Sequence, residues 1–385
     1  MKLQKKGSIV MLKELVTMSN YYGSNSELVI AGGGNTSVKD MDNLWIKGSG
    51  TTLATITEDG FVKMNRQALS AMFKEDYPTE TDAREAAVLS DLMGARSKGE
   101  EHKRPSVETL LHDLFNYKFV VHTHPALVNG LTCATAGQDK CKELFGNRVV
   151  WIELTPPGYV LSLKVRDKMA EFKRREGYDA DIVLLQNHGI FVAGDSQVEI
   201  EEKYNFVLNT ISASVSERPD FASVPVDKER VELLANAVQK LNGSGEIKFT
   251  TNVQVLKMLE SKEAFAPLAS VYTPDHMVYY KRAPLFVLAV EDINEQYKVL
   301  SASYETFVTQ YGFKPQIVAI QGLGYYSLGD TSKAAEINKI LFADTIKIAV
   351  YARSFGGPLF MADSMIDFIA NWEVESYRKK VNAEQ

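Results

Sequence analysis

The sequence predicts a globular protein of mixed α/β class, built from two domains. The chain has 385 residues, enough for two domains of the usual size. Apolar residues make up 45% of it and charged residues 24%, a balance that allows both halves to bury a core. Short β-rich runs alternate with longer segments whose apolar residues recur at helical spacing, and this alternation indicates mixed α/β structure.

The elements of the first half follow from these patterns in chain order. Apolar residues at helical spacing predict a helix over residues 9–22. "ELVIAGGGNTSVKD" is typical of a strand, a tight glycine loop and a second strand, and "NLWIKGSGTTLATI" of a strand that feeds a loop. We expect further helices over residues 80–98, 161–177 and 196–217, and one that starts at Pro105–Ser106 with Ser106 as its N-cap. "KFVVHTHP" is typical of a strand, and "DADIVLLQNHGIFVAGDS" of two strands joined by a turn.

A segment rich in charge separates the two predicted domains. "SERPDFASVPVDKERV", residues 216–231, holds two prolines and several charged residues, as linkers do. We therefore expect a first domain over 1–217, a linker over 218–230 and a second α/β domain over 231–385.

A weak internal repeat connects the two halves. "GYDADIVLLQNHGIFVAGDS" (177–196) aligns without gaps on "GFKPQIVAIQGLGYYSLGDT" (312–331), and seven of the twenty positions are identical. Strand–turn–strand segments also share glycine and isoleucine for local reasons, so chance similarity is the alternative. If the repeat reflects a duplication, Leu323 stands opposite His188, and "SVYTPD" (270–275) is the counterpart of "VVHTHP" without its histidines.

Charge and hydropathy exclude several classes of protein. The net charge of −6 gives no basic surface for nucleic acid. No run approaches the roughly 18 apolar residues of a membrane span. Lys13 and Glu14 interrupt the apolar run near the N-terminus, which excludes a signal peptide. Cys133 and Cys141 are too few for a disulfide framework, so we expect reduced thiols and a cytoplasmic location.

Three of the six histidines lie where a metal site could form. Residues i and i+2 of a strand point to the same face, so His122 and His124 present their imidazoles side by side. His188, in the turn "QNHGI", supplies a third nitrogen, and three protein ligands with an open position are the arrangement of catalytic zinc. Each motif alone is also typical of a strand end or a turn, but the three together favour a metal site.

Other polar residues are candidates for chemistry around such a site. Glu108, near the start of a predicted helix, is the candidate base, with a helix-capping carboxylate as the alternative. His112 lies one turn further on the same face, and we expect a packing or hydrogen-bonding role for it. The loops "GGGNTS" and "KGSGTT" offer Asn35, Lys47 and backbone N–H groups that could hold an anion, although each loop is also typical of a simple turn.

Five motifs in this order, "GGGNTSVK", "LWIKGSG", "RPSVETLLH", "VVHTHP" and "LLQNHGIFVAGDS", resemble the class II aldolase/adducin family. The resemblance covers roughly residues 9–215 and is greatest to the aldolase portion of bifunctional rhamnulose-1-phosphate aldolase/alcohol dehydrogenase proteins. It implies a three-layer α/β/α first domain with a largely antiparallel central sheet. The internal repeat, if it reflects a duplication, makes the second α/β domain a degenerate, non-catalytic copy. No short-chain dehydrogenase motif is found, so dehydrogenase activity is not expected.

The resemblance also implies roles for individual residues. His122, His124 and His188 match the zinc ligands, and Glu108 matches the acid that moves the proton. Asn35, Ser49, Gly50 and Ser106 match positions that hold the substrate phosphate. Val107 departs from the pattern, because many phosphate-binding aldolases have a second serine there; Lys47 could compensate by charge.

The implied activity is zinc-dependent retro-aldol cleavage of a ketose phosphate, such as L-rhamnulose 1-phosphate, to dihydroxyacetone phosphate and an aldehyde. The expected partner is a small sugar phosphate, without nucleic acid or membrane, and the protein is expected to be a homo-oligomer. Two alternatives remain open: an epimerase or decarboxylase on the same metal scaffold, and a non-catalytic adducin-like binding protein.

Overall fold

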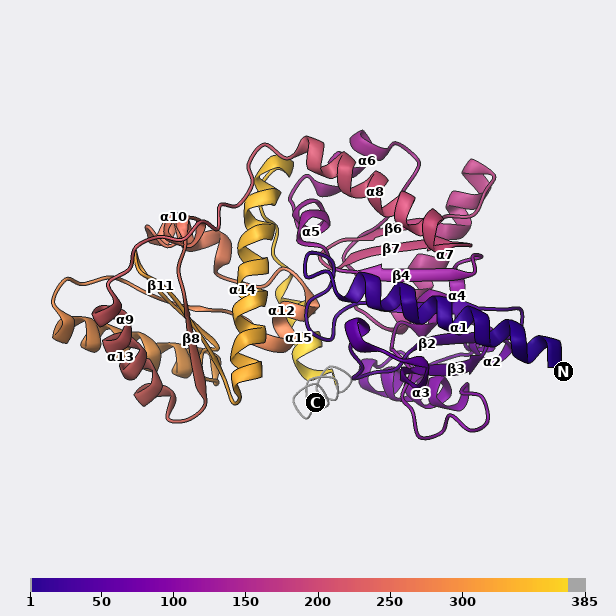
Figure 1. Ribbon diagram of the computed structural model, residues 1–385, viewed down its shortest axis with the longest axis horizontal. Helices are drawn as coiled ribbons and strands as arrows, with labels where there is room; N and C mark the ends of the chain where they lie inside the picture. Colours follow the sequence, from indigo (N-terminus) through magenta and orange to yellow (C-terminus); the bar gives the residue numbers. More distant parts are fainter. Residues whose placement is uncertain (1, 373–385) are drawn as a thin grey trace. The chain divides into compact units, whose positions relative to one another are not determined.

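The computed structural model describes residues 2–372 (Figure 1). The chain divides into two compact units: unit 1 comprises residues 1–132 and 137–213, and unit 2 comprises residues 133–136 and 214–385. The last part of the expected second domain, residues 373–385, lies outside the described residues, and the three domain boundaries given above stay predictions. Every helix among residues 2–372 is too short or too polar to cross a lipid bilayer.

Unit 1 is built on one seven-stranded sheet with the strand order β3-β2-β1-β4-β7-β6-β5. All neighbouring strands are antiparallel except β5 and β6, which are parallel. The expectation of a largely antiparallel sheet is confirmed. The strands are β1 (Asn35–Lys39), β2 (Asn43–Lys47), β3 (Phe61–Asn65), β4 (Phe119–Thr123), β5 (Val150–Ile152), β6 (Ile182–Leu185) and β7 (Gly189–Gly194).

Helices cover both faces of this sheet, which gives three layers. Helices α2, α3, α4 and α7 pack on one face. Contacts with β1, β7 and β4 place α1, α5 and α8, respectively, on the other face. Helix α6 packs against α5. The helices are α1 (Lys2–Gly23), α2 (Arg66–Met72), α3 (Thr81–Gly94), α4 (Thr109–Leu114), α5 (Ala126–Thr132), α6 (Gly137–Phe145), α7 (Tyr159–Glu176) and α8 (Gln197–Ser214).

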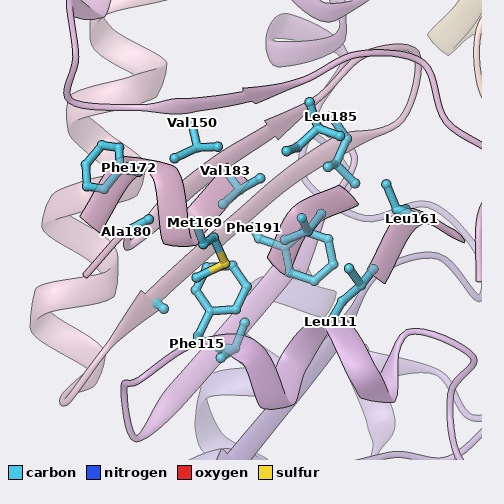
Figure 2. Packing of buried hydrophobic residues seen from close by; sticks show 14 residues of the cluster. Leu111, Phe115, Val150, Leu161, Met169, Phe172, Ala180, Val183, Leu185 and Phe191 are labelled. Carbon is cyan, nitrogen blue, oxygen red and sulfur yellow. The ribbon is translucent and has the colours of Figure 1, made fainter. Parts of the chain in front are cut away.

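The core between the sheet and helices α4 and α7 is aromatic at its centre. The ring of Phe115 stacks on that of Phe191 with 5.8 Å between the ring centroids. Figure 2 shows the two rings beside Met169 of α7, below the side chains of the strands. Phe191 also reaches the histidine cluster described below, so the core and the candidate site share a wall.

Two local predictions for unit 1 are wrong. The apolar run Leu28–Ile30 forms a turn and an irregular loop rather than a strand, because the chain reverses at Ala31, whose φ is +50°, and at Gly34, whose φ is +65°. Helix α4 begins at Thr109, so Glu108 rather than Ser106 is its N-cap residue, and the Glu108 side chain makes no capping hydrogen bond. Pro105 pairs instead with Gly48 in an isolated β-bridge, which delays the start of the helix.

A buried lysine closes the C-terminal end of helix α4. The Nζ of Lys39 donates hydrogen bonds to the carbonyl oxygen of Phe115, at 2.6 Å, and to that of His112. These carbonyls have no partner within so short a helix. Burial lowers the pKa of Lys39 to about 7. Below that pH the folded protein holds a charge in its interior.

Because the pKa of Lys39 is lowered in the folded protein, we expect the free energy of unfolding to depend on pH. Between pH 7 and pH 10 the unfolded chain binds a proton that the folded protein lacks, so the free energy of unfolding rises with pH. The slope contributed by one such group approaches about 1.4 kcal/mol per pH unit. Urea unfolding of wild type and Lys39→Met at pH 7, 8 and 9 measures it. The rise should be weaker in the variant, and equal slopes would contradict the prediction.

Unit 2 contains a four-stranded sheet with the order β8-β11-β10-β9. The strands are β8 (Glu246–Thr250), β9 (Leu285–Val287), β10 (Ile317–Ile320) and β11 (Gly324–Gly329). Helices α9 and α13 share one core with the sheet, and α14 packs against β8, β10 and β11. The helices are α9 (Lys228–Asn242), α10 (Val253–Met258), α11 (Lys262–Phe265), α12 (Pro274–Tyr280), α13 (Ile293–Tyr311), α14 (Ser332–Ala352) and α15 (Asp363–Asn371).

The sheet of unit 2 has the topology of half the sheet of unit 1. The order β8-β11-β10-β9 corresponds to β4-β7-β6-β5, and each pair of neighbours has the same relative direction. The equivalent strands β5 and β9, β6 and β10, and β7 and β11 all differ by 135 residues, the offset of the sequence repeat. A different topology would have excluded a duplication, and the observed one agrees with it.

The repeat extends to individual backbone hydrogen bonds. The N–H of Gln186 donates to Ile152, and that of Gln321 to Val287, both at 2.9 Å. In the turns that follow, the N–H of Asn187 donates to Thr132. That of Gly322 donates in the same way to Leu259. These matched bonds make local resemblance between two unrelated hairpins a poor explanation.

The register corrects one sequence prediction. "SVYTPD" is not the counterpart of "VVHTHP", because residues 270–275 form a loop and the start of α12. The counterpart of β4 is β8: His122 pairs with Phe191, and Phe249 pairs with Tyr326 at the equivalent position. The sequence alignment missed this pair because β4 and β8 differ by 127 residues, whereas the other three pairs of equivalent strands differ by 135 residues. Phe249, Thr251 and Leu323 thus occupy the three histidine positions.

Candidate metal centre

Three imidazoles from two segments of the chain meet at one end of the sheet in unit 1. His122 is on β4, His124 directly follows that strand, and His188 lies in the turn between β6 and β7. One ring nitrogen from each lies within 4.8 Å of the others, and the Nε2 atoms of His122 and His124 are 2.9 Å apart. The residues grouped by strand spacing are therefore adjacent in the fold.

The hydrogen bonding of His122 prepares one nitrogen for a cation. Its Nδ1–H donates to the carbonyl oxygen of Ile190 at 2.9 Å. Burial lowers the pKa of His122 well below its ordinary value, so the ring is neutral and Nε2 carries a lone pair. That lone pair faces the Nε2 of His124. Such a backbone acceptor on the distal nitrogen is typical of metal-binding histidines. The donor set therefore suits a divalent ion.

The other two histidines are held by close backbone contacts. A Cβ atom added at Gly189 would lie 2.5 Å from the carbonyl oxygen of Thr123 and 2.7 Å from Cδ2 of His124, so only glycine leaves room for that ring. The turn before His188 places Asn187 at φ +55°. The side chain of Asn129 donates to the carbonyl oxygen of His188 at 3.2 Å and fixes the turn from helix α5. Sequence reasoning did not identify Asn129, because nothing in the local pattern connects it to the turn.

Glu108 brings a carboxylate to the three histidines. Its Oε1 lies 3.4 Å from Nε2 of His122 and 3.4 Å from Nε2 of His188. Oε1 is buried and has no hydrogen-bond partner among the described residues, whereas Oε2 accepts from the Asn35 amide at 2.6 Å. Burial opposes ionisation, but the charge of His188 and the hydrogen bond from Asn35 lower the pKa of Glu108 below its ordinary value. A carboxylate with one open oxygen beside three imidazoles is a site for a cation or for proton transfer.

The predicted phosphate-binding residues lie in, or at the strand ends beside, three loops that contact one another. Lys47 is buried, and its Nζ lies 3.3 Å from the carbonyl oxygen of Gly32, in the loop that leads to Asn35. The backbone of Ser106 donates to Lys47 at 3.1 Å, and that of Ser49 donates to Arg104 at 2.8 Å. Gly50 follows in the same loop.

Asn35 connects these loops to the metal centre. It is the first residue of β1 and pairs with His122 across the sheet. Its amide nitrogen lies 3.3 Å from Oγ of Ser106 and 2.6 Å from Glu108. The structure thus brings Asn35, Ser106 and Glu108 together at the histidine cluster.

A curated relative, Uncharacterized oxidoreductase YuxG of Bacillus subtilis (strain 168), is 24% identical over 410 residues, which cover 95% of this chain and 58% of the relative. The chain thus spans less than two thirds of the length of that relative.

Solved structures similar to this chain overlap mainly with half of it. The N-terminal class II aldolase domain of a conserved protein from Thermoplasma acidophilum is 31% identical, with a TM-score of 0.44, and the match covers 52% of this chain and 91% of that one. L-fuculose-1-phosphate aldolase from Thermus thermophilus is 15% identical, with a TM-score of 0.35 and coverage of 52% and 92%.

Family models match both halves of the chain. Residues 13–205 match the Class II Aldolase and Adducin N-terminal domain, and residues 225–364 match the model described as Aldolase class II, second domain. Class II aldolases typically use a divalent metal, and the three-histidine group could bind one. The first model alone spans half of the sequence, and the chain belongs to the class II aldolase/adducin family.

Proposed function

We propose that this protein is a zinc-dependent aldolase that cleaves a ketose phosphate to dihydroxyacetone phosphate and an aldehyde. The observation that carries the proposal is the convergence of three imidazole nitrogens with a buried carboxylate oxygen of Glu108 that has no hydrogen-bond partner among the described residues. His122, His124 and His188 would hold the metal. When bound, a divalent ion supplies positive charge that stabilises negative charge developing on the substrate oxygens. L-rhamnulose 1-phosphate is the first substrate to test, from the resemblance of the motifs.

Glu108 is the residue proposed to move the proton. Breaking the carbon–carbon bond turns a hydroxyl into the aldehyde carbonyl, and this hydroxyl gives up its proton. The electron pair of the broken bond stays on the three-carbon fragment, whose carbon takes up one proton. Glu108 is ionised and its Oε1 is open, so it can hold a proton between these two events.

The phosphate of the substrate is proposed to lie against the contacting loops. Asn35, Ser49, Gly50 and Ser106 offer amide, hydroxyl and backbone N–H donors, and Lys47 adds a positive charge. Val107 adds no donor beside Ser106, and this departure keeps an epimerase or decarboxylase on the same scaffold as the second candidate. A non-catalytic adducin-like role is less favoured, because unit 1 keeps all three histidines. A homo-oligomeric state and a cytoplasmic location also stay predictions.

Metal content and substrate cleavage together test the proposal. Wild type loaded with Zn²⁺ should bind one ion per chain and release dihydroxyacetone phosphate from at least one ketose 1-phosphate in a panel. His124→Ala should lose both the ion and the activity, with activity falling at least about 100-fold. Elemental analysis after dialysis and a coupled assay for dihydroxyacetone phosphate give the two readouts.

Two results would contradict the proposal in different ways. Wild type that binds no divalent ion, even after reloading, would exclude metal-dependent chemistry at this site. Wild type that binds zinc but cleaves no member of the panel would favour the epimerase or decarboxylase alternative. His102→Ala is a matched control, because the His102 side chain is exposed and is not part of the three-histidine group. It should keep its metal.

A further inference from the structure

The two oxygens of the Glu108 carboxylate have different surroundings. Oε2 accepts a hydrogen bond from Asn35, and Oε1 has no hydrogen-bond partner among the described residues. The amide nitrogen Nδ2 of Asn35 donates to Oε2 at 2.6 Å, so the amide presents its N–H to the carboxyl group. Its own carbonyl oxygen then points away from Glu108, to a residue that the proposed reaction does not use.

That residue is His112, which lies fully buried behind the site. Its Nε2 contacts Oδ1 of Asn35, and its Nδ1 lies 2.8 Å from Oγ of Ser37. Because Oδ1 of Asn35 is an acceptor, Nε2 of His112 must carry the hydrogen. Burial lowers the pKa of His112 to about 3, so the ring is neutral and Nδ1 accepts from the Ser37 hydroxyl. The hydrogen bond from Asn35 to Glu108 thus sets the direction of the other hydrogen bonds in this row.

The secondary structure fixes the spacing of the four residues. Asn35 and Ser37 alternate along β1 and face the same side of the sheet. Glu108 and His112 are one helical turn apart, and the N–H of His112 donates to the carbonyl oxygen of Glu108 at 3.1 Å. The four side chains therefore form one row in which Ser37 contacts His112, His112 contacts Asn35, and Asn35 contacts Glu108.

The ring of His112 has little freedom to move. It meets Phe191 edge to face, with 5.4 Å between the centroids, and Phe191 stacks on His122 at 3.9 Å. Lys39 holds the carbonyl oxygen of His112 from the other end of the turn. An imidazole held in this way can keep the amide of Asn35 in one of its two orientations.

We propose that His112 is a positioning residue that holds the Asn35 amide with its N–H on Oε2 of Glu108, so that Oε1 is the oxygen that carries the proton. This inference rests on the proposed function of Glu108. Without the donor at Nε2, the amide can rotate and present its carbonyl oxygen to the carboxylate, which repels it. Glu108 would then lose the hydrogen bond from Asn35 that orients its carboxyl group with Oε1 toward the histidines.

Two conservative variants separate positioning from simple packing. Glutamine at position 112 can place an N–H close to where Nε2 of the histidine lies, whereas asparagine reaches only the region of Nδ1. His112→Asn should lower kcat roughly 10- to 100-fold, while KM changes less than about threefold and zinc content stays at one per chain. His112→Gln should restore kcat to within about threefold of wild type. Thermal unfolding of both variants checks that they are equally folded.

A second measurement does not depend on activity. Long-range ¹H–¹⁵N spectra of ¹⁵N-histidine-labelled protein report which ring nitrogen of a neutral histidine carries hydrogen, and the His112 signal is identified by its loss in His112→Gln. The inference requires hydrogen on Nε2, and hydrogen on Nδ1 would overturn it. Equal kcat in the two variants would overturn it as well. If wild type cleaves no ketose phosphate, the proposed function fails, while the spectra still decide whether the hydrogen-bonded row exists.

Discussion

The Glu108→Gln variant is expected to lose about 10²- to 10⁴-fold in kcat for retro-aldol cleavage, the usual contribution of a positioned acid–base group. Glutamine has nearly the same shape and can still accept the hydrogen bond from Asn35 through its amide oxygen. It cannot hold a proton for the substrate, however. The loss should therefore fall on kcat, with zinc content kept by the three histidines.

Steady-state kinetics with parallel elemental analysis measure this effect. Glu143→Gln provides the matched control, because Glu143 is an exposed acid of α6 that pairs with Lys140. The control should retain wild-type kcat. A Glu108→Gln variant that keeps kcat within about threefold of wild type would remove Glu108 from the proton-transfer step. A variant that loses zinc would instead assign Glu108 a direct role in holding the metal.

Gly189→Ala is expected to damage both the fold and the metal site. The added methyl group would lie 2.5 Å from the carbonyl oxygen of Thr123 and 2.7 Å from the ring of His124, so the strand pair and the ring must separate. Overpacking of this kind costs roughly 1–3 kcal/mol. In a unit of this size that corresponds to a fall of roughly 2–12 °C in Tm. Because the ring is displaced, zinc affinity should fall as well.

Differential scanning calorimetry with and without zinc tests this prediction. Gly94→Ala is the control, because a Cβ at Gly94 meets nothing within 4 Å and alanine favours a helix. The control should be as stable as wild type or slightly more stable. If Gly189→Ala keeps both the wild-type Tm and the zinc-dependent rise in Tm, the close contact does not position His124.

The sequence could predict the candidate site because its residues lie in short, recognisable segments. Strand periodicity placed His122 and His124 on one face, and His188 was identified by its turn. The hydrogen-bonding role predicted for His112 is confirmed, but its partners Asn35 and Ser37 could not be predicted. The roles of Lys39 and Asn129 could not be predicted either, because each depends on a contact between segments far apart in the chain. Local patterns do not report such contacts.

The wrong predictions have a common physical origin. Leu28–Ile30 is apolar enough for a strand, but the backbone reversal at Ala31 and the packing of the loop decide its conformation. Ser106 is a good N-cap residue, but a bridge between Pro105 and Gly48 holds the chain extended at that point. In both cases the tertiary structure overrides a valid local preference.

Unit 2 shows what the shared sheet needs in order to fold. In unit 2, Phe249, Thr251 and Leu323 occupy the positions that the three histidines have in unit 1. The backbone hydrogen bonds of the β6–β7 turn are nevertheless repeated in the β10–β11 turn. The imidazoles therefore contribute little to forming the frame. The same sheet thus forms in one chain with and without the three histidines, so a metal site can be gained or lost at this end of the sheet without a change of fold.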